Sequence, residues 1–173
     1  MPVPIKSEML LPGYFDIVGN GQIATLTESP GWGGLTPPVG NLTNNNLIQT
    51  NQQIQFKFEW GVYGIFAHMV NPLFEWRIEV FLEKYGPGEF SLGPVGRLSL
   101  PWSAGIVTTP TQVNFPGNIG STTITIPPYS IPEGLYDVVA VIRLHDMPSG
   151  LPCFSAAFAE FGKIHVYREH TTI

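Results

Sequence analysis

The carboxylates and histidines near the end of the chain are the first candidates for chemistry. Glu160, His165 and Glu169 are residue types that bind metal ions, and they lie close together in the sequence. In an unbroken strand, however, Glu160 and His165 would point to opposite faces, because their positions differ by an odd number. The chain has no His-x-His, no His-Glu-x-x-His and only one cysteine, Cys153. We therefore expect no metal site and no cofactor.

Paired carboxylates and activated nucleophiles would indicate an enzyme. Glu75, Glu79 and Glu83 could supply the two acids of a glycosidase, but those acids must lie on either side of a cleft. The regular spacing of these three glutamates instead predicts one solvated strand face, with cross-strand ion pairs to Lys57 or Arg77. No Gly-x-Ser-x-Gly motif and no complete phosphate-binding glycine motif occurs. We therefore predict a protein that is not an enzyme.

Aromatic residues in turn-like segments are the remaining candidates for a site. Trp32 lies in a Ser-Pro-Gly-Trp-Gly-Gly segment, Trp102 in Leu-Pro-Trp-Ser, and Tyr129 lies close to prolines. A loop aromatic residue can stack on a sugar ring or anchor a protein interface. Trp32, Trp102 and Tyr129 are therefore the candidate ligand-binding residues. A sugar platform requires both tryptophans to be exposed on one rim, and the alternative is that they fold back over the end of the domain.

Strands are the elements that would carry these residues. Apolar and polar residues alternate over Ile54–Val62 and again over Phe74–Lys84, which is the period of a half-buried strand. Gly134–Leu144 is apolar on both faces, as expected of a covered central strand. Further candidate strands are Gly21–Thr27, Arg97–Leu100, Ile106–Thr109, Thr111–Phe115, Ser121–Pro127 and Phe161–Arg168, and the last of these could begin as early as Phe154. The pattern predicts an all-β protein, an antiparallel β-sandwich of about 7–9 strands, immunoglobulin-like or jelly-roll-like.

The connections complete a single domain over residues 1–173. A tight reversal at Tyr85–Gly88 is expected to join Phe74–Lys84 to a partner strand that begins near Glu89. Residues 29–50 read as a long loop, and Gly61–Pro72 as a second irregular connection that could hold a helical turn. The first 20 or so residues, rich in proline up to residue 12, are expected to form an extended N-terminal arm.

One stretch resembles a known family at the level of the fold. The run from Ile124 to Val138, with Gly134-Leu-Tyr136 at the start of a strand, resembles the E-to-F corner of immunoglobulin-like domains. The resemblance implies that the Tyr136 hydroxyl bonds to an upstream backbone group, and it places Trp76 like the buried tryptophan of strand C. The chain departs from the family in having no cysteine pair between the sheets and in its greater length.

The small number of basic residues argues against two classes of partner. Charged residues make up 12% of the chain, its net charge is −5, and no two of its eight lysines and arginines are adjacent. Nucleic acids and anionic membranes both require a basic surface, so neither is an expected partner. The N-terminus lacks the apolar run of a signal peptide, and no stretch approaches the length of a membrane helix. We therefore expect synthesis in the cytoplasm, and either residence in a particle or release by a non-classical route.

Three hypotheses about function remain open. The first is a structural or assembly subunit that contacts other protein subunits and associates with itself, because low charge suits a surface covered by neighbours. The second is a carbohydrate-binding, lectin-like module that uses the loop aromatic residues. The third is an accessory domain that contacts a partner through a sheet edge such as Thr111–Thr125.

Overall fold

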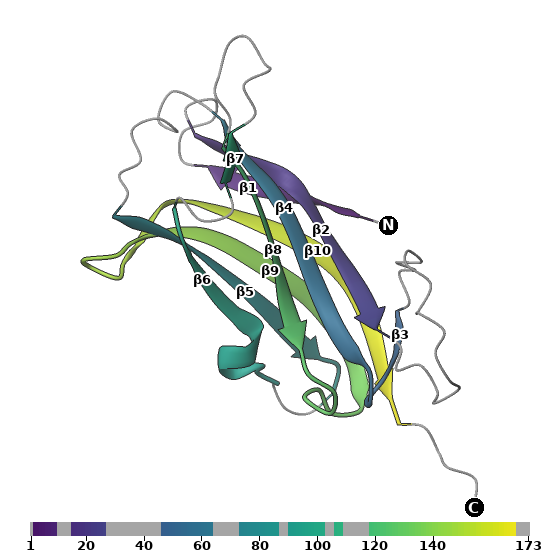
Figure 1. Cartoon of the computed structure of the whole chain (residues 1–173). Helices are drawn as coiled ribbons and strands as arrows, with labels where there is room; N and C mark the ends of the chain where they lie inside the picture. The colour runs from purple at the N-terminus through teal and green to yellow at the C-terminus, as the bar shows by residue number, and fades with distance from the viewer. Residues whose placement is uncertain are drawn as a thin grey trace, which may run out of the picture.

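The structure, a computed structural model, describes residues 2–9, 15–26, 46–63, 73–86, 90–102, 106–108 and 118–168. Within these ranges the chain is almost entirely β-strand, which confirms the all-β prediction (Figure 1). None of the described residues form a helix long and apolar enough to cross a membrane. The strands are β1 (Val3–Met9), β2 (Asp16–Leu26), β3 (Leu47–Gln49), β4 (Gln53–Tyr63), β5 (Phe74–Lys84), β6 (Arg97–Pro101), β7 (Ile106–Thr108), β8 (Asn118–Ile126), β9 (Gly134–Asp146) and β10 (Pro152–Tyr167).

The strands form two packed layers, seen in Figure 1 as the ribbons of β2, β4 and β8 in front of those of β5, β9 and β10. One layer has the order β2-β4-β8-β7, and the other has the order β10-β9-β5-β6. These orders match the A-B-E-D and G-F-C-C′ sheets of an immunoglobulin-type sandwich. Of the two predicted architectures, the structure therefore has the immunoglobulin-like one.

Strand β1 joins the two layers into one continuous hydrogen-bonded path. It pairs antiparallel with β10 from Ile5 to Met9 and with β2 from Val3 to Ile5. The prediction of an extended N-terminal arm is therefore wrong for residues 3–9 and 16–20, which are sheet strands. An alternating segment such as Val3–Ile5 gains backbone hydrogen bonds and buries Ile5 by adding to an open sheet edge.

Three other predicted boundaries differ from the structure. Leu47–Gln49, placed in the long loop, forms β3 and pairs parallel with the end of β10, so the described residues contain ten strands rather than 7–9. The partner strand of β5 begins at Arg97, preceded by a single bridge at Phe90 and the 3-10 turn η2 (Gly93–Gly96). Residues 61–63, predicted to begin the irregular Gly61–Pro72 connection, continue β4, while the rest of that connection and the predicted strand Thr111–Phe115 lie outside the described residues.

The core lies between the layers and is built from the alternating positions. From β4, Phe56, Phe58 and Trp60 point inward and are fully buried. Trp60 meets Trp76 of β5 edge to face, with 5.9 Å between the ring centroids. Burial of such large aromatic side chains is the main source of stability in a sandwich that has no disulfide.

The corner between β8 and β9 has the hydrogen bond that the resemblance implied. Tyr136 is fully buried, and its hydroxyl donates to the backbone carbonyl of Pro132 over 2.9 Å. Its ring packs edge to face on Phe90, 5.8 Å away. The bond fixes the path by which the chain crosses from one layer to the other.

We expect Tyr136→Phe to lower the free energy of unfolding by about 1–2 kcal/mol, because the carbonyl of Pro132 loses its partner. Burial also raises the pKa of Tyr136 above its ordinary value of 10.0, so the unfolded chain loses this proton first. Stability of the wild type should therefore fall as the pH rises past 10, and less so in the variant. Urea unfolding at several pH values measures both effects. Tyr129→Phe, at an exposed position, is the matched control and should change little.

Candidate functional site

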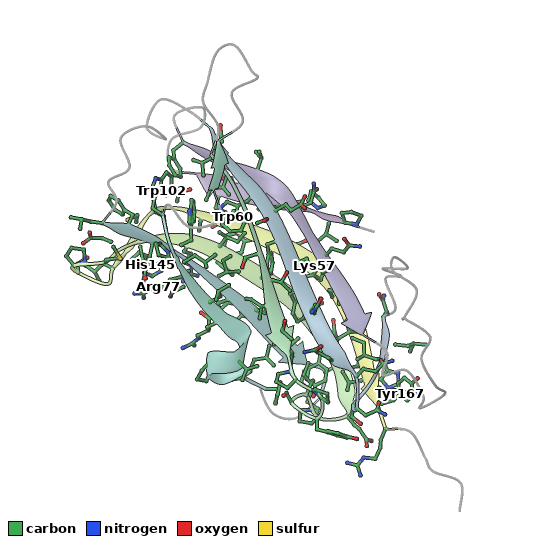
Figure 2. All side chains as sticks on the ribbon, in the orientation of Figure 1. Lys57, Trp60, Arg77, Trp102, His145 and Tyr167 are labelled. Carbon is green, nitrogen blue, oxygen red and sulfur yellow. The ribbon has the colours of Figure 1, made fainter. Side chains whose placement is uncertain are left out.

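The predicted aromatic site is not a shared platform in the structure. Trp102 is only 8% exposed, and its ring stacks on Trp76 with 5.3 Å between centroids. Figure 2 shows it beside Trp60 at the end of the sandwich. The prediction of an exposed ligand-binding Trp102 is therefore corrected: its indole completes the core, which is the alternative that the sequence left open. Trp32 lies outside the described residues.

Tyr129 is exposed, but it lies at the other end of the molecule. Its side chain is 76% exposed, and its backbone has a φ of 62°, which is unusual for a bulky residue. Its amide donates to the carbonyl of Thr50, next to the corner that precedes β9. Trp102 instead bonds to Phe74 at the start of β5, so roughly 30 Å of strand separates the two ends.

A β-bulge changes the expected geometry of Glu160 and His165. The pairing of β10 with β9 slips by one residue between Glu160 and Gly162, and Gly162 has a φ of 79°. Because of this extra residue both side chains lie on the outer face, rather than on opposite faces as an unbroken strand requires. Within the described part of the chain no three His, Cys, Asp or Glu side chains gather to hold a metal ion, and Glu169 lies outside it.

The three glutamates of β5 lie on the outer face of the sheet, and two of them take part in ion pairs. Arg77 contacts Glu75 over 2.6 Å, and Arg97 contacts Glu79 over 2.5 Å. Glu83 is exposed, and no ion pair to it is found among the described residues. The prediction of a solvated strand face is confirmed, but the pair of Arg77 is with Glu75 of the same strand rather than across strands, and Lys57 lies in the other layer.

The same outer face carries an apolar centre that alternation alone did not reveal. Phe81 of β5 is 43% exposed and lies opposite Val139 of β9, while Val141 lies opposite Phe158 of β10. Val139 and Phe158 are half-buried, and Val141 is buried without belonging to the core cluster. We call these four residues the outer patch. The signal in the sequence was that β9 is apolar on both faces.

Three of the chain's four arginines line one hollow beside the outer patch. The hollow has a volume of about 340 Å³ and is lined by Arg77, Arg97, Arg143 and His145, together with Glu79 and Val141. Arg77 lies directly opposite Arg143 across the β5–β9 pair, an arrangement that costs energy unless an anion balances it. Figure 2 shows Arg77 and His145 side by side there. We call this concavity the arginine hollow.

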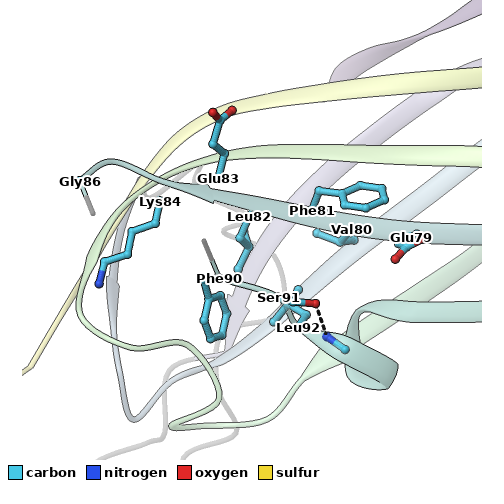
Figure 3. Close-up of a pocket in the computed structure, with 11 residues that line it drawn as sticks. Glu79, Val80, Phe81, Leu82, Glu83, Lys84, Gly86, Phe90, Ser91 and Leu92 are labelled. Atoms are coloured by element: carbon cyan, nitrogen blue, oxygen red, sulfur yellow. Dashed lines mark hydrogen bonds between the residues drawn. The ribbon is translucent and has the colours of Figure 1, made fainter. Parts of the chain in front are cut away.

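A larger groove lies along the second half of β5 (Figure 3). Strand β6 pairs only with Glu75–Glu79, so beyond that point a space of about 830 Å³ opens between Val80–Lys84 and the Phe90–Gly93 segment. The described lining combines apolar side chains with Glu79, Glu83 and Lys84, and it contains no histidine or cysteine. The groove therefore offers shape and charge to a partner, but no nucleophile–base pair.

Cys153 is half-buried near the turn that joins β9 to β10. Burial, reinforced by the nearby carboxylate of Asp146, raises the pKa of the Cys153 thiol. Only the thiolate is strongly nucleophilic, so these surroundings work against a reactive cysteine.

Comparison with known proteins does not place the chain in a family. No protein-family profile matches the chain, and no curated protein sequence matches it. Among solved structures, the CARDB domain of the PF1109 protein from Pyrococcus furiosus, crystallised in complex with di-metal ions, is similar in fold. The two share 10% sequence identity with a TM-score of 0.35, over 91% of this chain and 97% of that domain.

Proposed function

We propose that the protein is a non-enzymatic structural subunit that assembles with other protein subunits, in the first place with copies of itself. The observation that carries this proposal is the outer patch. Phe81, Val139 and Phe158 keep exposed apolar surface in the middle of a sheet face, and charged residues surround them. An apolar centre within a polar rim is the usual anatomy of a protein interface.

The composition of the chain supports the same conclusion. Only 12% of its residues are charged, and a surface poor in charge suits contact with neighbouring subunits. Carbohydrate binding has weaker support, because Trp102 is buried and Tyr129 stands alone at the far end among the described residues.

The proposal is tested by light scattering across a concentration series. We expect the wild type to have a mass above the 19.0 kDa of one chain, and Phe81→Asp to shift it towards the monomer. Placing a carboxylate at the centre of an apolar contact buries a charge that has no partner. Val18→Asp is the matched control, because Val18 is 44% exposed, close to the 43% of Phe81, but lies in β2 of the other layer. A wild-type mass of one chain at every concentration contradicts the proposal.

A further inference from the structure

We infer that a second copy of this chain docks on the outer patch through a two-fold axis, and that the arginine hollow of each copy faces carboxylates of the other. This inference rests on the proposed function and names its partner and geometry. It follows from how charges are arranged along β5 and β9.

The arrangement is centred on one row of the sheet. Val80 of β5, Ala140 of β9 and Ala159 of β10 lie opposite one another across the three strands. The side chains of this row point into the core and are buried. On the outer face, the apolar positions lie one residue to either side of the row. An axis that lies in the interface along this row would place the outer patches of two copies against each other.

Charge of opposite sign lies three residues to either side of the central row. Arg77 and Arg143 form a basic row on one side, and Glu83 and Asp137 form an acidic row on the other. Each row is about 10 Å from the axis, at the usual rise of a strand. A two-fold rotation therefore brings the basic row of one copy over the acidic row of the other, twice in each dimer.

The acidic row spans two neighbouring strands, β5 and β9, so it can still meet the arginines of the second copy when the two sheets cross at an angle. Packed sheets cross at about 30°, and at 10 Å from the axis this moves the contact by about one strand. Glu83 of β5 and Asp137 of β9 are neighbours. An arginine of the second copy that is displaced from Asp137 towards β5 therefore meets Glu83. The Tyr85 hydroxyl donates a hydrogen bond to the carboxylate of Asp137 over 3.2 Å. Lys163 of β10 lies opposite Asp137, and its ammonium group lies over the Tyr85 ring.

The arginine hollow provides a concave site that can receive a side chain of the second copy. Arg77 and Arg97 are already paired with glutamates of β5, but no ion pair or hydrogen bond of the Arg143 side chain is found among the described residues. The 340 Å³ hollow beside it can admit a carboxylate side chain. Arg143 and Glu83 are thus exposed charges without partners among the described residues, and the two-fold contact supplies one for each.

The test is a charge-reversal experiment on the full chain. We expect Arg143→Glu and Glu83→Arg to raise the dimer dissociation constant at least about tenfold each, because like charges then meet twice across the axis. An equimolar mixture of the two variants should form a heterodimer with an affinity within about threefold of the wild type. Arg168→Glu is the control for net charge, because Arg168 pairs with Glu133 away from the outer patch. Thermal unfolding confirms that each variant is folded.

The outcomes separate this inference from the proposed function. A wild-type dimer that loses affinity in both single variants and regains it in the mixture supports the two-fold contact. A wild-type oligomer that both reversals leave intact, or a mixture that does not recover, overturns the contact and leaves the proposed function standing. Growth beyond a dimer without limit also overturns it, because a two-fold contact closes. A wild-type monomer contradicts the proposed function itself.

Discussion

Replacing Trp76 by alanine is expected to lower the free energy of unfolding by about 3–5 kcal/mol, the cost of deleting a large buried aromatic side chain. Trp76 is 1% exposed and lies between two other tryptophans, at 5.9 Å from Trp60 and 5.3 Å from Trp102. Its removal leaves a cavity where the two layers meet and takes the packing partner away from Trp102. Urea unfolding followed by circular dichroism measures the loss.

Trp76→Phe is the informative companion variant. The Nε1–H of Trp76 is buried and has no hydrogen-bond partner among the described residues. A buried donor without a partner costs about 1–3 kcal/mol, and phenylalanine removes it while keeping an aromatic ring. We therefore expect Trp76→Phe to lose less than half as much stability as Trp76→Ala. Equal losses in the two variants would contradict this expectation, because the ring that phenylalanine keeps would then contribute nothing to stability.

Replacing Gly19 by alanine should be comparably severe for a different reason. A Cβ atom at Gly19 would overlap the carbonyl oxygen of Glu59 and lie 2.6 Å from the Cα of Trp60. Both atoms belong to the backbone of β4, which is paired on its other side with β8. The strand cannot move away without breaking that pairing, so we expect a loss of more than about 3 kcal/mol, at the upper end for overpacking.

Gly21→Ala is the matched control for this prediction. Its Cβ would also collide, but with the tip of the Phe161 ring at 2.7 Å, and a side chain can rotate or shift. We expect a loss of about 1–2 kcal/mol there. Urea unfolding measures both variants, and near-ultraviolet circular dichroism reports the packing of the aromatic core. A Gly19→Ala variant as stable as Gly21→Ala would refute the argument from backbone contact.

The amino-acid sequence by itself determined most strands of the sandwich, though not β1 and β3, and one of its corners. In β4 and β5 the apolar and polar residues alternate, and burial follows that alternation because each strand has one face in the core. The Gly134-Leu-Tyr136 corner was predictable because its hydrogen bond spans only four residues. The glutamates of β5 likewise share a face by strand geometry alone.

Only the tertiary structure decided which strand edges pair and which side chains lie on each face. Strand β1 closes the gap between the layers, a role set by pairing with β10 about 150 residues further along the chain. A bulge at the Glu160–Gly162 step places His165 on the outer face, and a bulge depends on the neighbouring strand. Trp102 is buried because Trp76 is there to stack on it. The arginine hollow joins residues of β5, β6 and β9, and proximity between strands that are distant in sequence is fixed by register, which alternation does not specify.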